Sequence, residues 1–289
     1  MIGFRVKKTA FPPDPMRIKC VSPWGGGKRT LAPKIVELLG EHTEYHEPFV
    51  GGCAILARKP RCAVERINDL NPKVVRVLKS VRDDYDKLGG ALARVPFAEG
   101  TYLAAVDWLK SNPDRHDWLA VVQQLIVWWM GPNGLAGTTA EGWFATRHST
   151  TGGSPAVRWE SFKGSLQAHS ERLAGVEVRG QHFKDYLLTV PDCTGAALYV
   201  DPPYLDKAFK YECDFALEDH YLLSMILNRS YSKSRVVVSY YDHPLLAELY
   251  PAKRWRRVEV NVSKAIASTS GTAKRAVEVL LVNDVGGRK

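Results

Sequence analysis

The stretch Ala196-Ala197-Leu198-Tyr199-Val200-Asp201-Pro202-Pro203-Tyr204 decides how the rest of the chain is interpreted. A short apolar run bounded by turn formers is typical of a strand that is buried on both faces of a parallel sheet. The two prolines end that strand, because proline fixes φ and has no N–H group to donate to a neighbouring strand. The sequence therefore predicts a carboxylate, a rigid carbonyl and an aromatic ring together at the end of a buried strand.

These groups suit the methylation of an exocyclic amine on a flat base. Such an amine is a poor nucleophile, because its lone pair is delocalised into the ring. The Asp201 carboxylate and the Pro202 carbonyl can accept its two hydrogens, which localises the lone pair and stabilises the developing positive charge. We expect Tyr204 to stack on the base, with Pro203 fixing the turn. An ordinary strand-ending turn is the alternative, since Asp-Pro pairs often make one.

Composition places the chain among ordinary soluble proteins. It has 289 residues, 45% hydrophobic and 25% charged, and no apolar run near the roughly 20 residues of a membrane helix. We therefore expect a cytoplasmic protein. The odd number of cysteines, none in a CxxC pair, favours free thiols over disulfides or zinc, and we predict no metal site. A net charge of +9 favours a polyanionic partner, with nucleic acid the first candidate.

The order of the predicted elements indicates a doubly wound α/β domain. Apolar periodicity and turn residues predict strands over residues 45–49, 63–67, 176–179, 196–200, 235–240 and 276–282. They predict helices over residues 29–39, 72–82, 103–109, 118–129, 166–173, 217–227 and 244–249. Residues 131–157 lack periodicity, and so long a loop is usually functional or flexible. We infer one α/β domain interrupted by a mainly helical insertion.

A second group of candidate residues follows the first two predicted strands. The turn Glu47-Pro48-Phe49-Val50-Gly51-Gly52-Cys53 opens a helix, and its glycines let the backbone approach a ligand closely. Asp69 ends the second strand, where a carboxylate can accept hydrogen bonds from ribose hydroxyls. The GxGxxG motif does not fit, because Phe49 stands where it requires glycine. A P-loop does not fit either, because Arg29 stands where it requires Ser or Thr. The pattern favours a cofactor without phosphate, such as S-adenosylmethionine.

Taken together, the chain resembles the Dam-like DNA adenine methyltransferases over nearly its whole length. The motifs come in that family's order, and the resemblance rests on their joint register: Trp24-Gly25-Gly26-Gly27-Lys28, Glu47 to Gly52, Asn68 to Pro72, Asn133-Gly134-Leu135, Asp201 to Tyr204, Phe215 with Asp219-His220, and Arg275 with Glu278-Val279-Leu280. It implies a Rossmann-like class I methyltransferase with a mostly parallel sheet. Residues 1–87 and 181–289 would form the catalytic domain, and residues 88–180 the target-recognition insertion.

The resemblance also implies roles for individual residues. Those expected at S-adenosylmethionine are Trp24, Gly26, Gly27, Lys28, Glu47, Phe49, Gly51, Asp69, Phe183 and Asp201. Within this set, Lys28 would neutralise the methionine carboxylate, Asp69 would hold the ribose and Phe183 would contact the adenine. The expected catalytic residues are Asp201, Pro202, Pro203 and Tyr204. The expected DNA contacts are Asn133, Arg147, Arg158 and Lys163, with the basic side chains on phosphates.

Two departures from the family's pattern put a GATC target in doubt. Pro23 stands where the family often has Lys, and Gly137 where it often has Arg, and both are donor types that match guanine acceptors. Cys53 replaces a usual third glycine, which we expect only to narrow the turn. We expect Trp128 and Trp129 to belong to a helix core, and we favour packing over intercalation for Trp143 and Phe144.

The expected activity is transfer of a methyl group to the N6 amine of an adenine flipped out of duplex DNA, in a bacterial or phage-infected cell, including a restriction-modification setting. Two rival functions remain open at this point. One is methylation of adenine in RNA, which uses the same chemistry, and the other is a DNA-binding relative without catalysis. We expect a monomer, with a dimer as the alternative.

Overall fold

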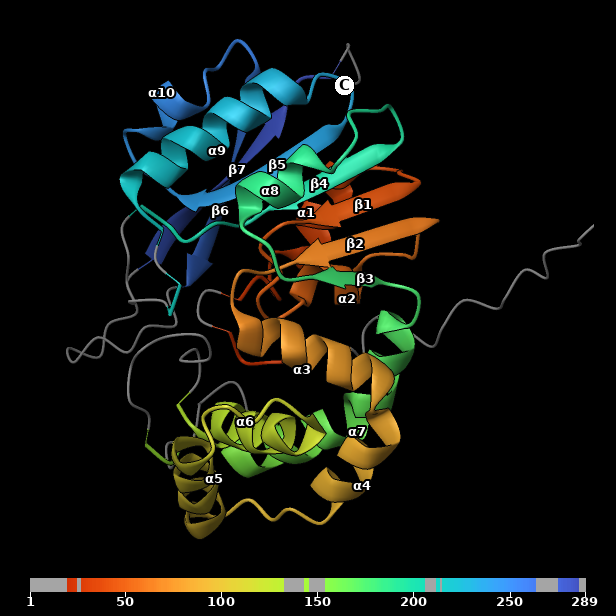
Figure 1. Cartoon of the computed structure of the whole chain (residues 1–289). Helices are drawn as coiled ribbons and strands as arrows, with labels where there is room; N and C mark the ends of the chain where they lie inside the picture. Colours follow the sequence, from red (N-terminus) through yellow and green to blue (C-terminus); the bar gives the residue numbers. More distant parts are fainter. Residues whose placement is uncertain are drawn as a thin grey trace, which may run out of the picture.

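The computed structural model describes residues 20–24, 27–132, 143–145, 154–205, 212–213, 215–263 and 275–285. These residues form a seven-stranded sheet with helices on both faces and a helical unit below it (Figure 1). The strands are β1 (Glu44–Glu47), β2 (Val64–Asn68), β3 (Glu177–Arg179), β4 (Ala196–Val200), β5 (Arg235–Tyr241), β6 (Trp255–Ser263) and β7 (Arg275–Asn283). None of the described helices is both long and apolar enough to cross a membrane.

The sheet has the order β3-β2-β1-β4-β5-β7-β6. Neighbouring strands from β3 to β5 pair in parallel, whereas β7 runs antiparallel to both β5 and β6. The order reverses at β1, since β2 lies on one side of it and β4 on the other. In open α/β sheets the ligand-binding crevice lies at such a switch point, at the carboxyl ends of the strands. The predicted Rossmann-like fold is confirmed.

Strand β4 is buried on both faces, as its uninterrupted apolar sequence predicts. Ala197 and Tyr199 belong to one hydrophobic core, and Leu198 and Val200 to the other. This alternation follows from the two-residue period of a strand. The two cores require a helical layer on each side of the sheet, because apolar strand surface is stable only when another element covers it.

The helices are α1 (Ala32–Leu39), α2 (Ala54–Arg58), α3 (Pro72–Asp83), α4 (Tyr85–Ala93), α5 (Glu99–Ser111), α6 (Trp118–Met130), α7 (Pro155–Leu173), α8 (Phe183–Leu188), α9 (Leu217–Ser230) and α10 (Leu246–Leu249). In Figure 1, α8 and α9 lie in front of the sheet and α1 behind it. Helices α4 to α7 form the lower unit, and α6 and α7 pack against α3. This arrangement attaches the lower unit to the sheet through α3.

Aromatic packing holds the lower unit together and connects it to the start of the described chain. The rings of Trp129 and Phe162 stack with centroids 4.5 Å apart. The indole N–H of Trp129 donates to the carbonyl of Val21, 3.1 Å away, and Trp128 is buried. The prediction that both tryptophans belong to a helix core is confirmed. Phe144 packs on Phe97, as expected.

The structure differs from the sequence predictions at several places, and helices α4 and α8 were not predicted. Trp143 is 66% exposed, so the expectation that it packs into a core is wrong. Helix α7 begins at Pro155, eleven residues before the predicted start at Leu166, because the Ser154 hydroxyl accepts the N–H of Val157 and caps it. Strand β6 was not predicted. It lies at the sheet edge with β7 as its pairing neighbour, and the alternation of Val258, Val260 and Val262 with polar residues is a strand signal that the prediction overlooked.

Candidate active site

Asp201 lies immediately after the last residue of β4, at the switch point of the sheet. Its side chain is 21% exposed. One carboxylate oxygen, Oδ1, accepts a hydrogen bond from the hydroxyl of Ser239 on β5, at 2.7 Å. The Ser239 hydroxyl lies 2.9 Å from the Tyr199 hydroxyl on β4. Two neighbouring strands therefore fix the orientation of the Asp201 carboxylate.

The other carboxylate oxygen of Asp201 faces the ammonium of Lys28. Lys28 Nζ lies 3.0 Å from Asp201 Oδ2 and 3.3 Å from Glu278 Oε1 of β7. Burial alone would lower the pKa of Lys28, but the two carboxylates more than offset it and raise that pKa above its ordinary value. Burial raises the pKa of Glu278, even though Lys28 opposes the change. We call Lys28, Asp201 and Glu278 the Lys28 cluster.

Tyr204 belongs to the same surroundings as the Lys28 cluster. Its hydroxyl donates to Glu278 Oε1, and Lys28 Nζ lies 4.9 Å from the centre of its ring. The ring packs against Tyr240 and Tyr241, with centroids 5.6 and 4.7 Å away. Tyr204 and the neighbouring Pro203 remain partly exposed, whereas Pro202 is buried. The turn thus presents a fixed aromatic ring next to the Asp201 carboxylate.

The glycines after β1 make room for Trp24. A Cβ atom at Gly51, where φ is +46°, would lie 3.0 Å from the indole nitrogen of Trp24, and one at Gly52 would lie 2.9 Å from the carbonyl oxygen of Ser22. The close approach that the sequence predicted is therefore made by residues 22–24. Cys53 has a φ of +62°, so the position of the missing third glycine keeps the left-handed conformation that favours glycine.

Asp69 is positioned by backbone donors on both sides. Its two oxygens accept the N–H of Gly51 at 2.8 Å and of Asn71 at 2.9 Å. Burial raises its pKa to about 6, although both N–H groups act in the opposite direction. The amide of Asn68 donates to the carbonyls of Pro48 and Gln181, which connects the end of β2 to the residues that follow β1 and β3. Asp69 stays partly exposed, with acceptor capacity left for a ligand.

The aromatic rings of Phe49, Phe183 and Phe215 pack against one another. Phe49 lies 5.6 Å from Phe183 and 5.7 Å from Phe215, and the last two are 5.3 Å apart. Phe183 and Phe215 are buried, whereas Phe49 is partly exposed. Phe49 is therefore the ring of this group that offers a face to a flat ligand.

Glu47 ends β1 beneath this surface and is itself buried. Burial raises its pKa to about 8, and the negative charge of Asp201 acts in the same direction. The hydroxyl of Tyr45 donates to its carboxyl group at 2.8 Å. Burial and the charge of Asp201 thus both disfavour the ionised form of Glu47.

The predicted DNA contacts have different surroundings. Arg158 is partly buried near the start of α7, and burial together with the nearby charge of Arg29 lowers its pKa. The ammonium of Lys163 donates to the Val95 carbonyl at 3.2 Å and pairs with Glu160 at 2.9 Å, so its charge serves contacts within the helical unit. Gly26, Asn133 and Arg147 lie outside the described residues.

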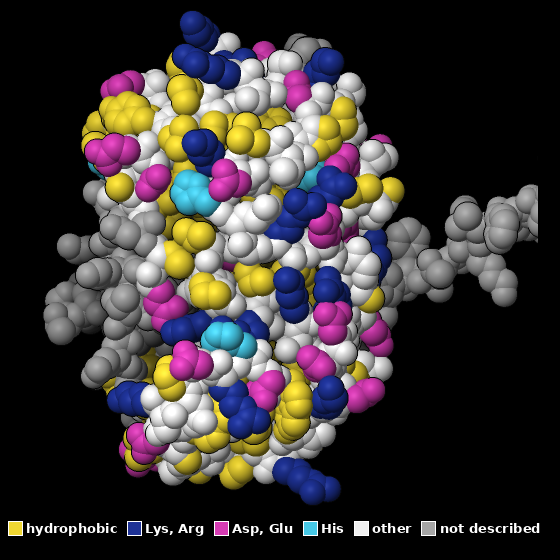
Figure 2. Space-filling view, in the orientation of Figure 1, with side chains coloured by type: hydrophobic (Ala, Val, Ile, Leu, Met, Phe, Trp, Pro, Cys, Tyr) yellow, Lys and Arg dark blue, Asp and Glu magenta, His cyan; other side chains and the backbone are white. Residues whose placement is uncertain are grey.

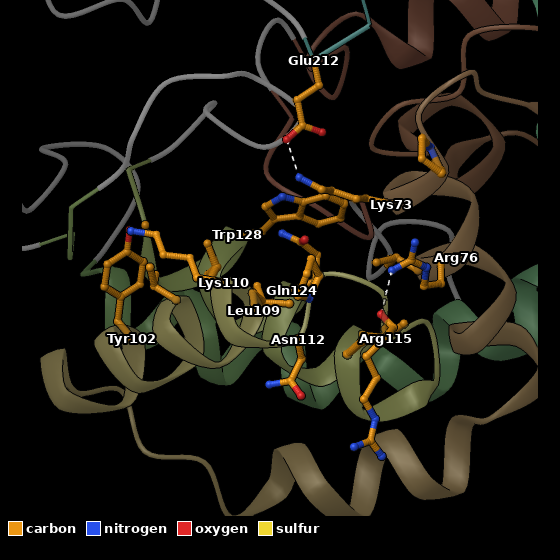
Figure 3. A pocket seen from close by; sticks show the side chains of 18 of the residues that line it. Lys73, Arg76, Tyr102, Leu109, Lys110, Asn112, Arg115, Gln124, Trp128 and Glu212 are labelled. Carbon is orange, nitrogen blue, oxygen red and sulfur yellow. Dashed lines mark hydrogen bonds and ion pairs between the residues drawn. The ribbon is translucent and has the colours of Figure 1, made fainter.

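A cavity of about 460 Å³ lies between α3 and the helices α5 and α6 (Figure 3). Its lining includes the carboxylate of Glu212, which accepts from the ammonium of Lys73 at 2.6 Å and from the amide of Asn71 at 2.9 Å. The basic side chains along the lining are Lys73, Arg76, Lys110 and Arg115. None of the lining residues is among the predicted site residues, but two of them contact the candidate site: Trp128 packs on Trp24, and Glu212 bonds to Asn71, whose N–H donates to Asp69.

Sequence reasoning missed Ser239 and Glu278 as members of the site. Both are polar residues inside apolar strands, in the runs Val236-Val237-Val238-Ser239-Tyr240 and Val277-Glu278-Val279-Leu280. A buried polar group in such a run needs a partner, and that signal was available. Ser239 reaches Asp201 because β4 and β5 pair in parallel with Val200 opposite Val238, and only the fold supplies that register.

One family model matches most of the chain. Residues 24–264 match the family model of the D12 class N6 adenine-specific DNA methyltransferases. No curated protein sequence matches the chain significantly.

Several solved structures are similar to the chain over most of its length, at low identity. Precorrin 8w decarboxylase from Methanobacterium thermoautotrophicum is 11% identical, with 89% of this chain and 90% of that chain covered and a TM-score of 0.38. The putative methyltransferase yhhF from Escherichia coli is 10% identical, with 90% and 85% covered and a TM-score of 0.36. A SAM-dependent methyltransferase from Agrobacterium tumefaciens is 8% identical, with 89% and 61% covered and a TM-score of 0.39.

Proposed function

Because the chain belongs to the D12 class of N6 adenine-specific DNA methyltransferases, we propose that it methylates the N6 amine of an adenine flipped out of duplex DNA. The observation that carries this proposal is the position of Asp201. Its carboxylate is partly exposed at the switch point of the sheet, is held by Ser239 and lies beside the ring of Tyr204. The enzyme would act on DNA in the cytoplasm of a bacterial or phage-infected cell.

The residues present fit S-adenosylmethionine, which supplies a methyl group on a positively charged sulfur when it is bound. The Asp69 carboxylate is partly exposed and can accept ribose hydroxyls. The exposed face of Phe49 suits the adenine. The Lys28 cluster contains two carboxylates against one ammonium, a composition that favours a cation. Trp24 covers Gly51 and would close the methionine end.

Asp201 can bind the target amine without losing its present partners. A carboxylate has about four lone-pair directions, and Ser239 and Lys28 use two of them. A hydrogen bond from the amine to Asp201 makes the nitrogen more nucleophilic and stabilises the charge that develops on it. The Pro202 carbonyl is the proposed second acceptor. Because the Tyr204 hydroxyl is anchored on Glu278, its ring is fixed in orientation for stacking on the base.

Duplex DNA as the substrate is supported by charge. The chain carries a net charge of +9, and phosphate contacts dominate the affinity of proteins for DNA. On the face drawn in Figure 2, Lys and Arg side chains alternate with Asp and Glu instead of forming one patch. We propose two phosphate-binding regions: Arg158 with Arg29, and the basic residues along the cavity between α3 and α5. Because N6 of adenine is base-paired in the duplex, the base must be flipped out for the reaction.

The test is transfer of labelled methyl groups from S-adenosylmethionine to duplex DNA from a methylation-free bacterium, with RNA of the same base composition as the parallel substrate. After digestion to nucleosides, we expect the label in N6-methyldeoxyadenosine. Label confined to RNA would establish the rival RNA methyltransferase, and label in another nucleoside would contradict the choice of adenine. Absence of transfer, together with absence of thermal stabilisation by S-adenosylmethionine, would support the DNA-binding relative without catalysis.

A further inference from the structure

The Lys28 cluster joins three parts of the chain that are far apart in sequence. Lys28 precedes α1, Asp201 follows β4 and Glu278 lies on β7. One ammonium lies within 3.3 Å of oxygens from both carboxylates. When all three groups are ionised, the cluster has a formal net charge of −1. The side chains of Lys28 and Glu278 are each 6% exposed, so water screens this charge only weakly.

Glu278 is the member of the cluster whose charge has no role in the proposed chemistry, in which it only anchors the Tyr204 hydroxyl. Asp201 is the acceptor for the amine, and Lys28 is the counterion of Asp201. Without Glu278, Lys28 and Asp201 would form a neutral pair. Glu278 gives Lys28 a second carboxylate and accepts the hydroxyl of Tyr204.

We propose that Glu278 is a positioning residue that gives the Lys28 cluster its net negative charge and thereby favours S-adenosylmethionine over the product S-adenosylhomocysteine. The two molecules have the same adenosine and amino-acid groups. They differ at sulfur, which is a positively charged sulfonium in the first and a neutral thioether in the second. A nearby net negative charge stabilises the first selectively, and it thus favours exchange of product for a new cofactor. This inference rests on the proposed function, because it assumes that the site binds S-adenosylmethionine.

The ratio of the two dissociation constants measures this selectivity without turnover. Glu278→Gln removes one charge and keeps an oxygen that can accept the Tyr204 hydroxyl. We expect the affinity for S-adenosylmethionine, relative to that for S-adenosylhomocysteine, to fall about tenfold, as one unit charge several ångströms away in a weakly screened site implies. Glu278→Asp keeps the charge and should restore most of the ratio. Isothermal titration of each ligand, without DNA, provides the constants.

Two further variants make the experiment specific. Glu259→Gln, at a 60% exposed carboxylate on the adjacent strand β6, makes the same change in net charge in solvent and should leave the ratio within about twofold. Lys28→Met removes the positive member, so it should shift the ratio in favour of S-adenosylmethionine. Loss of the contact with the methionine carboxylate, which the family resemblance implies for Lys28, would weaken both ligands equally and cancel in the ratio.

The outcomes separate this inference from the proposed function. If the wild-type protein binds neither ligand, the proposed function fails. If it binds both and Glu278→Gln leaves their ratio unchanged, or weakens both equally, then Glu278 has no selective role and the inference is overturned. Lys28→Met shifting the ratio toward S-adenosylhomocysteine would overturn it as well, and this arm remains informative if the Glu278 variants do not fold.

Discussion

Two charge clusters of opposite composition lie at opposite ends of the parallel strands. The Lys28 cluster has one ammonium between two carboxylates, at the carboxyl ends of the parallel strands. The second cluster, which we call the Glu65 cluster, has one carboxylate between two cations. Lys59 Nζ lies 2.6 Å from Glu65, and the Arg172 guanidinium makes two contacts with it, at 2.6 and 2.8 Å. Glu65 is the second residue of β2, near the amino ends of the strands.

The two clusters differ in what surrounds them. In the Glu65 cluster all three side chains are at most 5% exposed. Because Arg172 comes from α7, the cluster joins the sheet to the helical unit. In the Lys28 cluster, Asp201 reaches a partly exposed surface beside Tyr204. The comparison indicates that the Glu65 cluster holds the fold together, whereas the Lys28 cluster keeps charge available for a ligand.

The pKa directions agree with this division. Burial acts to raise the pKa of both Glu65 and Glu278. For Glu65 the two cations more than compensate, and its pKa is lowered. For Glu278 the single ammonium does not compensate, and its pKa is raised. A carboxylate whose charge is fully neutralised by its neighbours suits a structural role, and one with an uncompensated charge is typical of a functional site.

The largest expected effect is that of Asp201→Ala on the rate of methyl transfer. Removing the acceptor of the target amine should lower the single-turnover rate of DNA methylation by a factor of about 10³ or more, as loss of a group that stabilises developing charge does in other enzymes. The free energy of unfolding should change by only about 1 kcal/mol, since Lys28 keeps Glu278 as its partner. Asp242→Ala, at an exposed carboxylate after β5, is the matched control and should retain its rate. A thousandfold slower Asp242 variant would show that the effect is not specific to Asp201.

Glu65→Gln should have the reverse effect: a large loss of stability and little change in the rate of methyl transfer. It leaves Lys59 and Arg172 buried without a carboxylate, which costs about 3 kcal/mol or more in the free energy of unfolding. Urea unfolding measures this change. The rate per folded molecule should stay within a few-fold of wild type. Glu177→Gln removes a half-exposed ion pair on β3 and should cost under about 1 kcal/mol. Equal destabilisation by the two variants would contradict the structural role of the Glu65 cluster.

Ser239→Ala tests whether the hydroxyl that binds Asp201 contributes to the rate as well as to stability. It removes the hydroxyl that orients Asp201 and leaves the buried Tyr199 hydroxyl without this partner, so we expect a loss of about 1–2 kcal/mol in stability and a slower methyl transfer. The double variant Ser239→Ala with Tyr199→Phe removes both hydroxyls. It should recover stability but not the rate, and recovery of both would show that Ser239 acts on the fold alone.

The smallest expected effect concerns the pH dependence of stability. The contributions of Glu65 and Glu278 to the free energy of unfolding should change with pH in opposite directions. The pKa of Glu65 is lowered in the folded protein, so its contribution is present above its ordinary pKa of 4.5 and is lost as the pH falls below it. The pKa of Glu278 is raised, so its contribution is present below 4.5 and is lost as the pH rises. Each change is at most about 1.4 kcal/mol per pH unit. Unfolding free energies of wild type, Glu65→Gln and Glu278→Gln from about pH 2.5 to 8 test the signs, and parallel profiles would contradict them.

The sequence was sufficient for the elements with a strong local pattern. The apolar run 196–200 and the prolines after it predicted the bounds of β4, and the proline and glycine signals placed α1 and α3 within a few residues. The first half of α7 was taken for loop, although Trp159, Phe162 and Leu166 are spaced as on one helix face. The Gly- and Ser-rich residues before it obscured that pattern.

The partners within the site depend on tertiary packing. Lys28 was expected at the methionine carboxylate, and the structure brings it to Asp201 and Glu278. No local pattern relates residue 28 to residue 278, because their contact depends on β7 pairing antiparallel with β5. Likewise, the glycine turn and Trp24 were both expected at the cofactor, and only the fold shows that Trp24 lies against Gly51. Residue types and strand ends were predictable, and the pairing of charges was not.

The most direct test of the central claim is a structure of the protein with duplex DNA and S-adenosylhomocysteine. We predict a flipped adenine whose N6 atom lies about 2.7–3.2 Å from an Asp201 carboxylate oxygen, with its ring against Tyr204. An adenine that stays in the duplex, or an N6 amine bound by other groups while Asp201 contacts only Lys28 and Ser239, would contradict the account.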